Sequence, residues 1–368
     1  MRSVNHEQLK TILKIAYKTK TPYFVWGATG IGKSYTIREL AKELAKEEKR
    51  EFVEWNNLTR EEKLKVMENI ENYFLFIDQR ALQFDLGDFK LPKFDNTNGT
   101  FEWCIPLVYQ VICNPKAKGI LFFDEFNLAP PSIQGMFYQI INDKQIGEHK
   151  ISDGIWVVGA GNRLEDRANV YEMPSPLLDR FEHIELSIPD LKEWTNWALK
   201  NDIDSRIIAF LHFKPSYLFK FDTKAKDKAF PTPRGWERLS NMIKEITKDY
   251  ELLENIIGSN VGEAVSIEMI SFLKLKERIK IEEFLENPKK ILEIPKERTD
   301  LRYSIISELA QLYKNNTKVF DKIMKVVELL KPEFAILCLR MLRAVNPQHF
   351  VKNAVKHNFI QKYAKYLL

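Results

Sequence analysis

The chain has little cysteine and no long hydrophobic run, and both absences exclude classes of protein. Only three of the 368 residues are cysteines, at positions 104, 113 and 338. This odd count has no closely spaced pair, which argues against a disulfide framework and a zinc site. The uncharged run at residues 103–115 is too short to span a bilayer, and the first ten residues carry charges where a secretory signal has an apolar stretch. We therefore expect a cytoplasmic protein without a membrane segment.

The chain also lacks a strong excess of one charge. Its 56 lysines and arginines against 51 aspartates and glutamates leave a net charge of +5, with both signs interspersed. We find no basic tract and no helix-turn-helix signature, so the composition does not by itself argue for nucleic acid, nor does it exclude it. With 45% apolar and 29% charged residues, a chain of this length predicts a soluble, globular protein of two or three domains.

What the chain does contain is a phosphate-binding motif near its start. Residues 27–34 are Gly-Ala-Thr-Gly-Ile-Gly-Lys-Ser, which is the full Gly-x4-Gly-Lys-Ser pattern. An apolar run typical of a buried strand precedes the motif, and a helical pattern follows it to about Lys49. The glycines leave main-chain N–H groups open to phosphate oxygens, and the helix N-terminus adds its positive dipole end. The residues expected to bind the nucleotide are Gly27, Ala28, Thr29, Gly30, Ile31, Gly32, Lys33, Ser34 and Tyr35.

Two carboxylates follow a second apolar run. Residues 119–125 are Gly-Ile-Leu-Phe-Phe-Asp-Glu, typical of a central parallel strand that ends where ligands bind in open α/β sheets. We expect Asp124 and the Ser34 hydroxyl to hold Mg²⁺, a cation that takes few protein ligands. Lys33 is expected to reach the outer phosphates, and Glu125 to orient or deprotonate the attacking water.

Three further polar residues are candidates for the same site. Asn162 follows a third apolar run and could bond both the attacking water and a γ-phosphate oxygen, although Gly-Asn is also turn chemistry. Arg180 is either an ion-paired surface residue or a finger that stabilises charge on the nucleotide of a neighbouring subunit. Arg234 is expected in the first turn of a helix capped by Thr232, an unfavourable place for a cation, which suggests an anionic partner.

The pattern becomes nearly all helical after residue 189. We therefore expect an α/β nucleotide-binding core over residues 1–189, a helical lid over 190–290 and a C-terminal helical region over 291–368. Residues 78–106 have mixed polarity and little periodicity, and we expect a long irregular segment there with an Asn-Gly turn at 98–99.

These motifs, in this order, make the chain resemble AAA+ ATPases, and within them most closely the MoxR family. The resemblance covers about residues 1–245 and rests on residues 27–34, 122–131, 157–163, 177–181 and 232–237. It implies a P-loop NTPase core with a parallel sheet, followed by an all-α lid. In the family's terms, the assignments are Lys33 and Ser34 as Walker A, Asp124 and Glu125 as Walker B, Asn162 as sensor 1, Arg180 as the arginine finger and Arg234 as sensor 2.

The chain departs from the family pattern at three places. Arg238, one turn after Arg234, is a rival for the sensor 2 role. Arg163 stands where the family often has proline. Residues 85–92 look like the family's Asp-Leu-x-Gly-x-Pro segment but differ in their glycine and spacing.

The resemblance implies an ATPase that uses ATP and Mg²⁺ in a ring, usually a hexamer, because Arg180 must reach a neighbour's site. It also implies a chaperone-like role in remodelling a protein partner, often one with a von Willebrand factor A domain. Two alternatives remain open, a nucleic-acid-linked motor or loader and a nucleotide-gated scaffold without turnover. The motifs alone do not distinguish adenine from guanine.

Overall fold

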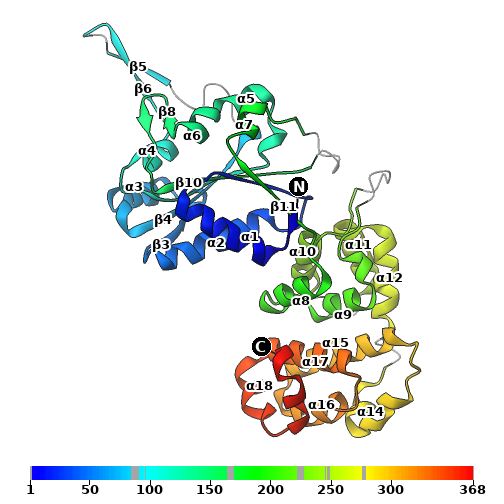
Figure 1. Cartoon of the computed structure of the whole chain (residues 1–368). Helices are drawn as coiled ribbons and strands as arrows, with labels where there is room; N and C mark the ends of the chain where they lie inside the picture. Colours follow the sequence, from blue (N-terminus) through cyan, green and yellow to red (C-terminus); the bar gives the residue numbers. More distant parts are fainter. Residues whose placement is uncertain are drawn as a thin grey trace. The chain divides into compact units, whose positions relative to one another are not determined.

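A computed structural model describes residues 2–83, 91–95, 97–163, 170–221, 228–244, 246, 249–275 and 279–367. The chain forms two compact units, Met1–Ile188 and Pro189–Leu368 (Figure 1).

The first unit is built on a seven-stranded parallel sheet with the strand order β1-β11-β2-β10-β7-β4-β3. Its central strands are nearly continuous apolar runs because both of their faces are buried, and this is the pattern expected of a parallel α/β sheet. The α/β fold class is therefore confirmed. The strands are β1 Ser3–Val4, β2 Tyr23–Trp26, β3 Glu51–Glu54, β4 Tyr73–Arg80, β7 Lys118–Asp124, β10 Ile155–Gly161 and β11 Glu182–Leu186.

Helices α1 and α2 pack against one another and against strands of this sheet. The helical stretch Pro131–Asn142 is divided at Phe137, whose N–H donates to the carbonyl of Gln134. The Phe137 ring is fully buried, with its centroid 4.7 Å from that of Phe123, so core packing fixes the break. The helices are α1 His6–Thr19, α2 Lys33–Glu47, α3 Arg60–Glu68, α4 Leu107–Cys113, α5 Pro131–Met136, α6 Tyr138–Asn142 and α7 Ser175–Leu178.

The prediction that residues 78–106 form a long irregular segment is wrong in part. It contains an antiparallel hairpin of β5 Leu91–Asp95 and β6 Thr100–Cys104, which projects from the first unit (Figure 1). The Asn-Gly turn is confirmed, because Gly99 has a left-handed φ of 65° between the two strands. Most of the 85–92 segment lies outside the described residues. A second short hairpin pairs β8 Gln145–Ile146 with β9 His149–Lys150.

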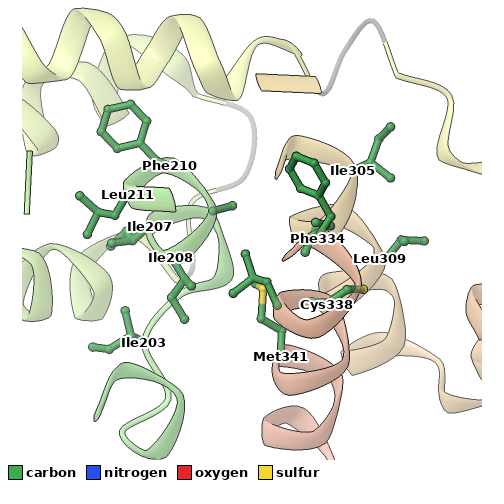
Figure 2. Packing of buried hydrophobic residues seen from close by; sticks show 14 of the residues in the cluster. Ile203, Ile207, Ile208, Phe210, Leu211, Ile305, Leu309, Phe334, Cys338 and Met341 are labelled. Atoms are coloured by element: carbon green, nitrogen blue, oxygen red, sulfur yellow. The ribbon is translucent and has the colours of Figure 1, made fainter. Parts of the chain in front are cut away.

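The second unit is helical. One apolar cluster runs from Trp194 to Ile360, and α9, α15 and α17 contribute much of it (Figure 2). A division of this unit at residue 290 remains a prediction. No described helix has the length and apolar character needed to cross a membrane. The helices are α8 Leu191–Lys200, α9 Ser205–Phe213, α10 Pro233–Ile243, α11 Tyr250–Val261, α12 Glu263–Leu273, α14 Ile281–Glu286, α15 Thr299–Asn315, α16 Phe320–Val327, α17 Pro332–Val345, α18 Pro347–Ala354 and α19 Ala364–Leu367.

Candidate nucleotide site

The phosphate loop joins the end of β2 to the start of α2, and its backbone requires glycine. Gly30 and Gly32 have left-handed φ values of 78° and 101°, which residues with a Cβ rarely adopt. A Cβ on Gly27 would lie 2.9 Å from Ile31 Cδ1 and 3.0 Å from the carbonyl oxygen of Leu186. The local sequence therefore allows the main chain to form a loop at a helix N-terminus, the arrangement that binds phosphate.

Lys33 lies inside this loop, with only 8% of its surface exposed. Its ammonium group donates to the carbonyl oxygens of Gly27 and Ala28, at 2.6 and 2.9 Å, and to Asn162 Oδ1 at 3.0 Å. These three acceptors are neutral, and hydrogen bonds from an ammonium to phosphate oxygens are stronger than those to neutral acceptors. The loop thus holds the cation where phosphate oxygens can take over its hydrogen bonds.

Ser34 and Asp124 supply a pair of adjacent oxygens beside the loop. The Ser34 hydroxyl donates to Asp124 Oδ2 at 2.6 Å, and Asp124 is the buried last residue of β7. A hydroxyl and a carboxylate are ligands that suit Mg²⁺, which keeps several of its waters. Within the described ranges, no three His, Cys, Asp or Glu side chains gather as a metal cluster. The pair suits a Mg²⁺ ion that is held partly by phosphate, and the metal role of Ser34 and Asp124 remains a prediction.

Glu125 directly follows the strand and has an unusual backbone. Its φ of 52° and ψ of 34° are left-handed, and its N–H donates to Asp124 Oδ1 at 3.0 Å. A non-glycine residue in this region carries about 1–3 kcal/mol of strain, which surrounding structure must offset. The half-buried carboxylate is thereby turned out of the strand direction at the edge where the phosphate loop lies.

Asn162 is brought into the site, as its sequence position predicted. Its Oδ1 accepts from Lys33 and, at 3.3 Å, from the Thr29 hydroxyl. Its main chain is clamped by Asn127, whose Nδ2 donates to the Asn162 carbonyl at 2.8 Å and whose Oδ1 accepts from the Asn162 N–H at 3.2 Å. Sequence reasoning gave Asn127 no role, because its partner lies 35 residues away and no local pattern marks the pair.

Asp78 is a second residue that the sequence did not reveal. Burial and the negative charge of Asp124 together raise the pKa of its carboxyl to about 6, against the opposing effect of Arg80 and Arg38. Its Oδ1 is buried and has no hydrogen-bond partner in the described part of the chain. It lies in β4, the strand that pairs with β7, so the site contains a third acidic group near the two Walker B residues.

Arg180 lies just after α7 with 41% of its side chain exposed. It pairs with Asp179 at 3.0 Å and donates to the Tyr138 hydroxyl at 3.4 Å. Across the residues that the structure describes, it has no hydrogen bond to the phosphate loop. The role of Arg180 on a neighbouring subunit remains a prediction.

Arg234 and Arg238 are both exposed on α10 of the second unit. The hydroxyl of Thr232 accepts from Gly235 N at 2.9 Å, which confirms the predicted helix cap. The sensor 2 role, and the choice between the two arginines, remain predictions. Tyr35 lies one residue into α2 beyond Ser34, and 37% of it is exposed.

One family model matches part of the first unit. Residues 22–181 match the family model for the AAA domain of the dynein-related subfamily. No curated protein matches the chain. Because the matching model describes the dynein-related subfamily, the narrower resemblance to the MoxR family remains a prediction.

Several solved structures are similar to the chain at low identity. The RuvB Holliday junction branch migration motor of Thermotoga maritima is 15% identical, with 89% of each chain covered and a TM-score of 0.31. The ORC2 protein of Aeropyrum pernix, in ADPNP-ADP complexes, is 13% identical, with 95% of this chain and 94% of that chain covered and a TM-score of 0.35. NtrX of Brucella abortus is 14% identical, with 94% and 69% covered and a TM-score of 0.33. Likenesses this weak carry no argument about activity.

Proposed function

We propose that the chain is a Mg²⁺-dependent ATP hydrolase of the AAA+ class that acts at the subunit interfaces of a ring and remodels or assembles a protein partner. Two hydrogen bonds carry this proposal. The Lys33 ammonium donates to Asn162 Oδ1 at 3.0 Å, and the Ser34 hydroxyl donates to Asp124 Oδ2 at 2.6 Å. These four residues come from separate motifs up to 129 positions apart. The AAA-domain match over residues 22–181 supports nucleotide hydrolysis as their common task.

Each residue has a part that its geometry supports. The loop N–H groups and Lys33 bind the phosphates of ATP, while Ser34 and Asp124 would hold Mg²⁺. When bound, Mg²⁺ offsets negative charge that develops on the phosphate oxygens. Glu125 orients the attacking water and accepts its proton, and Asn162 holds the water against the outer phosphate.

The ring is supported by the exposure of Arg180. An arginine with no bond to its own loop, within the described ranges, is placed to serve the nucleotide of the next subunit. By resemblance to the MoxR family, we propose a hexamer, a sensor 2 role for Arg234 and a partner with a von Willebrand factor A domain.

The test is steady-state hydrolysis of ATP and GTP with Mg²⁺ across protein concentration, for the parent, Glu125→Gln and Arg180→Ala. We expect activity per subunit to rise with concentration and to prefer ATP. Each variant should lose roughly 10³-fold or more, since both act on the transition state. Mixing the two variants should restore activity, because Arg180→Ala subunits keep intact sites and Glu125→Gln subunits keep intact arginines.

Three outcomes would contradict the proposal. ATP binding without turnover in the parent would favour the nucleotide-gated scaffold. Hydrolysis that depends on added DNA, with binding that weakens steeply as salt rises, would favour the nucleic-acid motor. Full activity of Arg180→Ala would remove the arginine finger and the argument for shared sites.

A further inference from the structure

Strand β11 lies between the residues that bind nucleotide and the turn that carries Arg180. It begins at Glu182, two residues after Arg180, and pairs in parallel with β2. β2 ends at Trp26, and the phosphate loop begins at the next residue. In this register His183 lies opposite Phe24, one pair after the start of the ladder.

His183 is hydrogen-bonded on both sides of its ring. The indole Nε1 of Trp26 lies 3.0 Å from His183 Nδ1, and His183 Nε2 lies 2.8 Å from the carbonyl oxygen of Leu178. An indole N–H can only donate, so Nδ1 accepts and the ring proton is assigned to Nε2, which donates to Leu178. Leu178 is the last residue of α7 and lies two positions before Arg180. The imidazole thus links the start of the phosphate loop to the turn that carries the arginine.

A second polar link joins the same strand to the other side of the nucleotide site. Arg163 follows Asn162 and pairs with Glu185 of β11 at 2.9 Å, with 33% and 23% of the two side chains exposed. Asn162 in turn accepts from Lys33. Arg163 stands where the resembling family often has proline, and a proline would have no side chain to pair with Glu185.

We propose that His183 is a positioning residue, which transmits the state of the phosphate loop through Trp26 and Leu178 to the arginine that a subunit offers its neighbour. The inference rests on the proposed function, because only a shared site gives Arg180 a target. The Arg163–Glu185 pair keeps β11 aligned with the Asn162 segment while His183 transmits the state of the phosphate loop to Arg180.

The first readout does not require hydrolysis. Amide hydrogen exchange of the segment 175–181 is compared with and without the ATP analogue AMPPNP in the full chain. In the parent, we expect AMPPNP to slow exchange in this segment. In His183→Phe, which keeps an aromatic ring and removes both hydrogen bonds, the analogue should still bind but no longer slow exchange there.

Trp26→Phe serves as a second variant, since it removes one hydrogen bond and should fold where His183→Phe does not. His149→Phe is the matched control, because the His149 Nε2 also contacts a main-chain oxygen in the same unit, that of Trp103 at 3.4 Å, away from β11. It should behave as the parent. An unchanged exchange rate in the parent, or retained slowing in both His183→Phe and Trp26→Phe, would overturn the inference.

The second readout locates the defect. Alone, His183→Phe should bind nucleotide as the parent does and lose roughly 10- to 100-fold in kcat, the effect of a misplaced catalytic group. Mixed with Glu125→Gln subunits, it should recover, because its own site is intact and its neighbour offers a correctly placed arginine. Failure to recover, with binding intact, would place the defect in the variant's own site and contradict the inference. A parent without ATPase activity would instead contradict the proposed function, and the exchange experiment would still decide the link.

Discussion

Lys33 of the first unit and Arg206 of the second are both buried cations, and they differ in what accepts their hydrogen bonds. Lys33 and Arg206 are 8% and 7% exposed. Arg206 holds both carboxylate oxygens of Asp204, at 2.9 and 2.7 Å, and donates to the carbonyls of Ile243 and Ile246 at 2.7 Å or less. Lys33 donates to two carbonyls of its own loop and to an amide.

The difference affects how readily Lys33 and Arg206 can exchange their hydrogen-bond partners. A guanidinium matched to a buried carboxylate is committed, since removal of either partner leaves the other charge uncompensated. An ammonium whose acceptors are neutral can exchange them for an anionic ligand. Burial alone therefore does not identify the site, and three predictions test this comparison between Lys33 and Arg206.

The largest expected effect is on activity, from Lys33→Ala. We expect ATP hydrolysis to fall by about four orders of magnitude, since Lys33 contacts the phosphates throughout the reaction. The melting temperature should change little, because the Lys33 hydrogen bonds to Gly27, Ala28 and Asn162 go to neutral acceptors, whereas Arg206 pairs with the carboxylate of Asp204. Lys14→Ala, which removes an exposed ion pair with Glu47, is the control and should keep parent activity. A Lys33→Ala protein that unfolds instead would break the comparison.

The next effect is on stability, from Arg206→Met. We expect the free energy of unfolding to fall by about 3–5 kcal/mol, because Asp204 is left buried without its partner. Urea unfolding followed by circular dichroism measures it. Adding Asp204→Asn should recover part of the loss, since the amide is neutral and its oxygen can still cap α9 through the Arg206 N–H. If Arg206→Met alone is as stable as the parent, the Arg206–Asp204 pair does not stabilise the fold.

The smallest effect is a dependence on pH, from Asp78→Asn in buffer with EDTA and no nucleotide. Burial and Asp124 raise the Asp78 pKa from 3.8 to about 6, so the folded state binds the proton more tightly than the unfolded state. The free energy of unfolding should therefore fall as pH rises from about 4 to 6, by at most about 3 kcal/mol, and Asp78→Asn should remove that fall and stabilise the protein at pH 7.

Asp202 of the second unit is the matched control, because its shift has the opposite sign. Burial opposes the shift, but the hydrogen bond from Lys244 and the charge of Lys314 lower the Asp202 pKa overall. The ionised Asp202 carboxylate therefore adds to the free energy of unfolding at neutral pH, and this contribution is lost as pH falls through the pKa of Asp202 in the folded state. Asp202→Asn should weaken the protein slightly at pH 7. The same pH response in both variants would show that local environment does not set the sign.

Much of the first unit could be predicted because its signals are local. The glycines of the phosphate loop, the acidic end of β7 and the Asn162 turn each identify themselves within a few residues, and the parallel sheet brings them together. The β5–β6 hairpin was missed for the opposite reason. Its register places Phe94 opposite Phe101, and these aromatic rings are 69% and 50% exposed, so no core-facing alternation marked the strands.

The residues that sequence reasoning missed act over long separations. His183 meets Trp26 across 157 positions, and Asn127 meets Asn162 across 35. Their identities are ordinary for a strand end or a turn, so only the fold gives them a function. In the second unit, periodicity predicted helices and buried faces, but an amphipathic helix carries the same pattern whatever it contacts.

The clamp on Asn162 has a consequence for how this sequence can evolve. The Asn127 side chain offers one donor and one acceptor to the main chain, as a neighbouring peptide group would. Aspartate lacks the donor and glutamine adds a methylene, and a Cβ on Gly161 would approach Asn127 Oδ1 to 2.4 Å. The residues allowed at position 127 therefore depend on the residue at position 161, and the reverse. We expect Asn127 and Gly161 to occur together among relatives that keep this site.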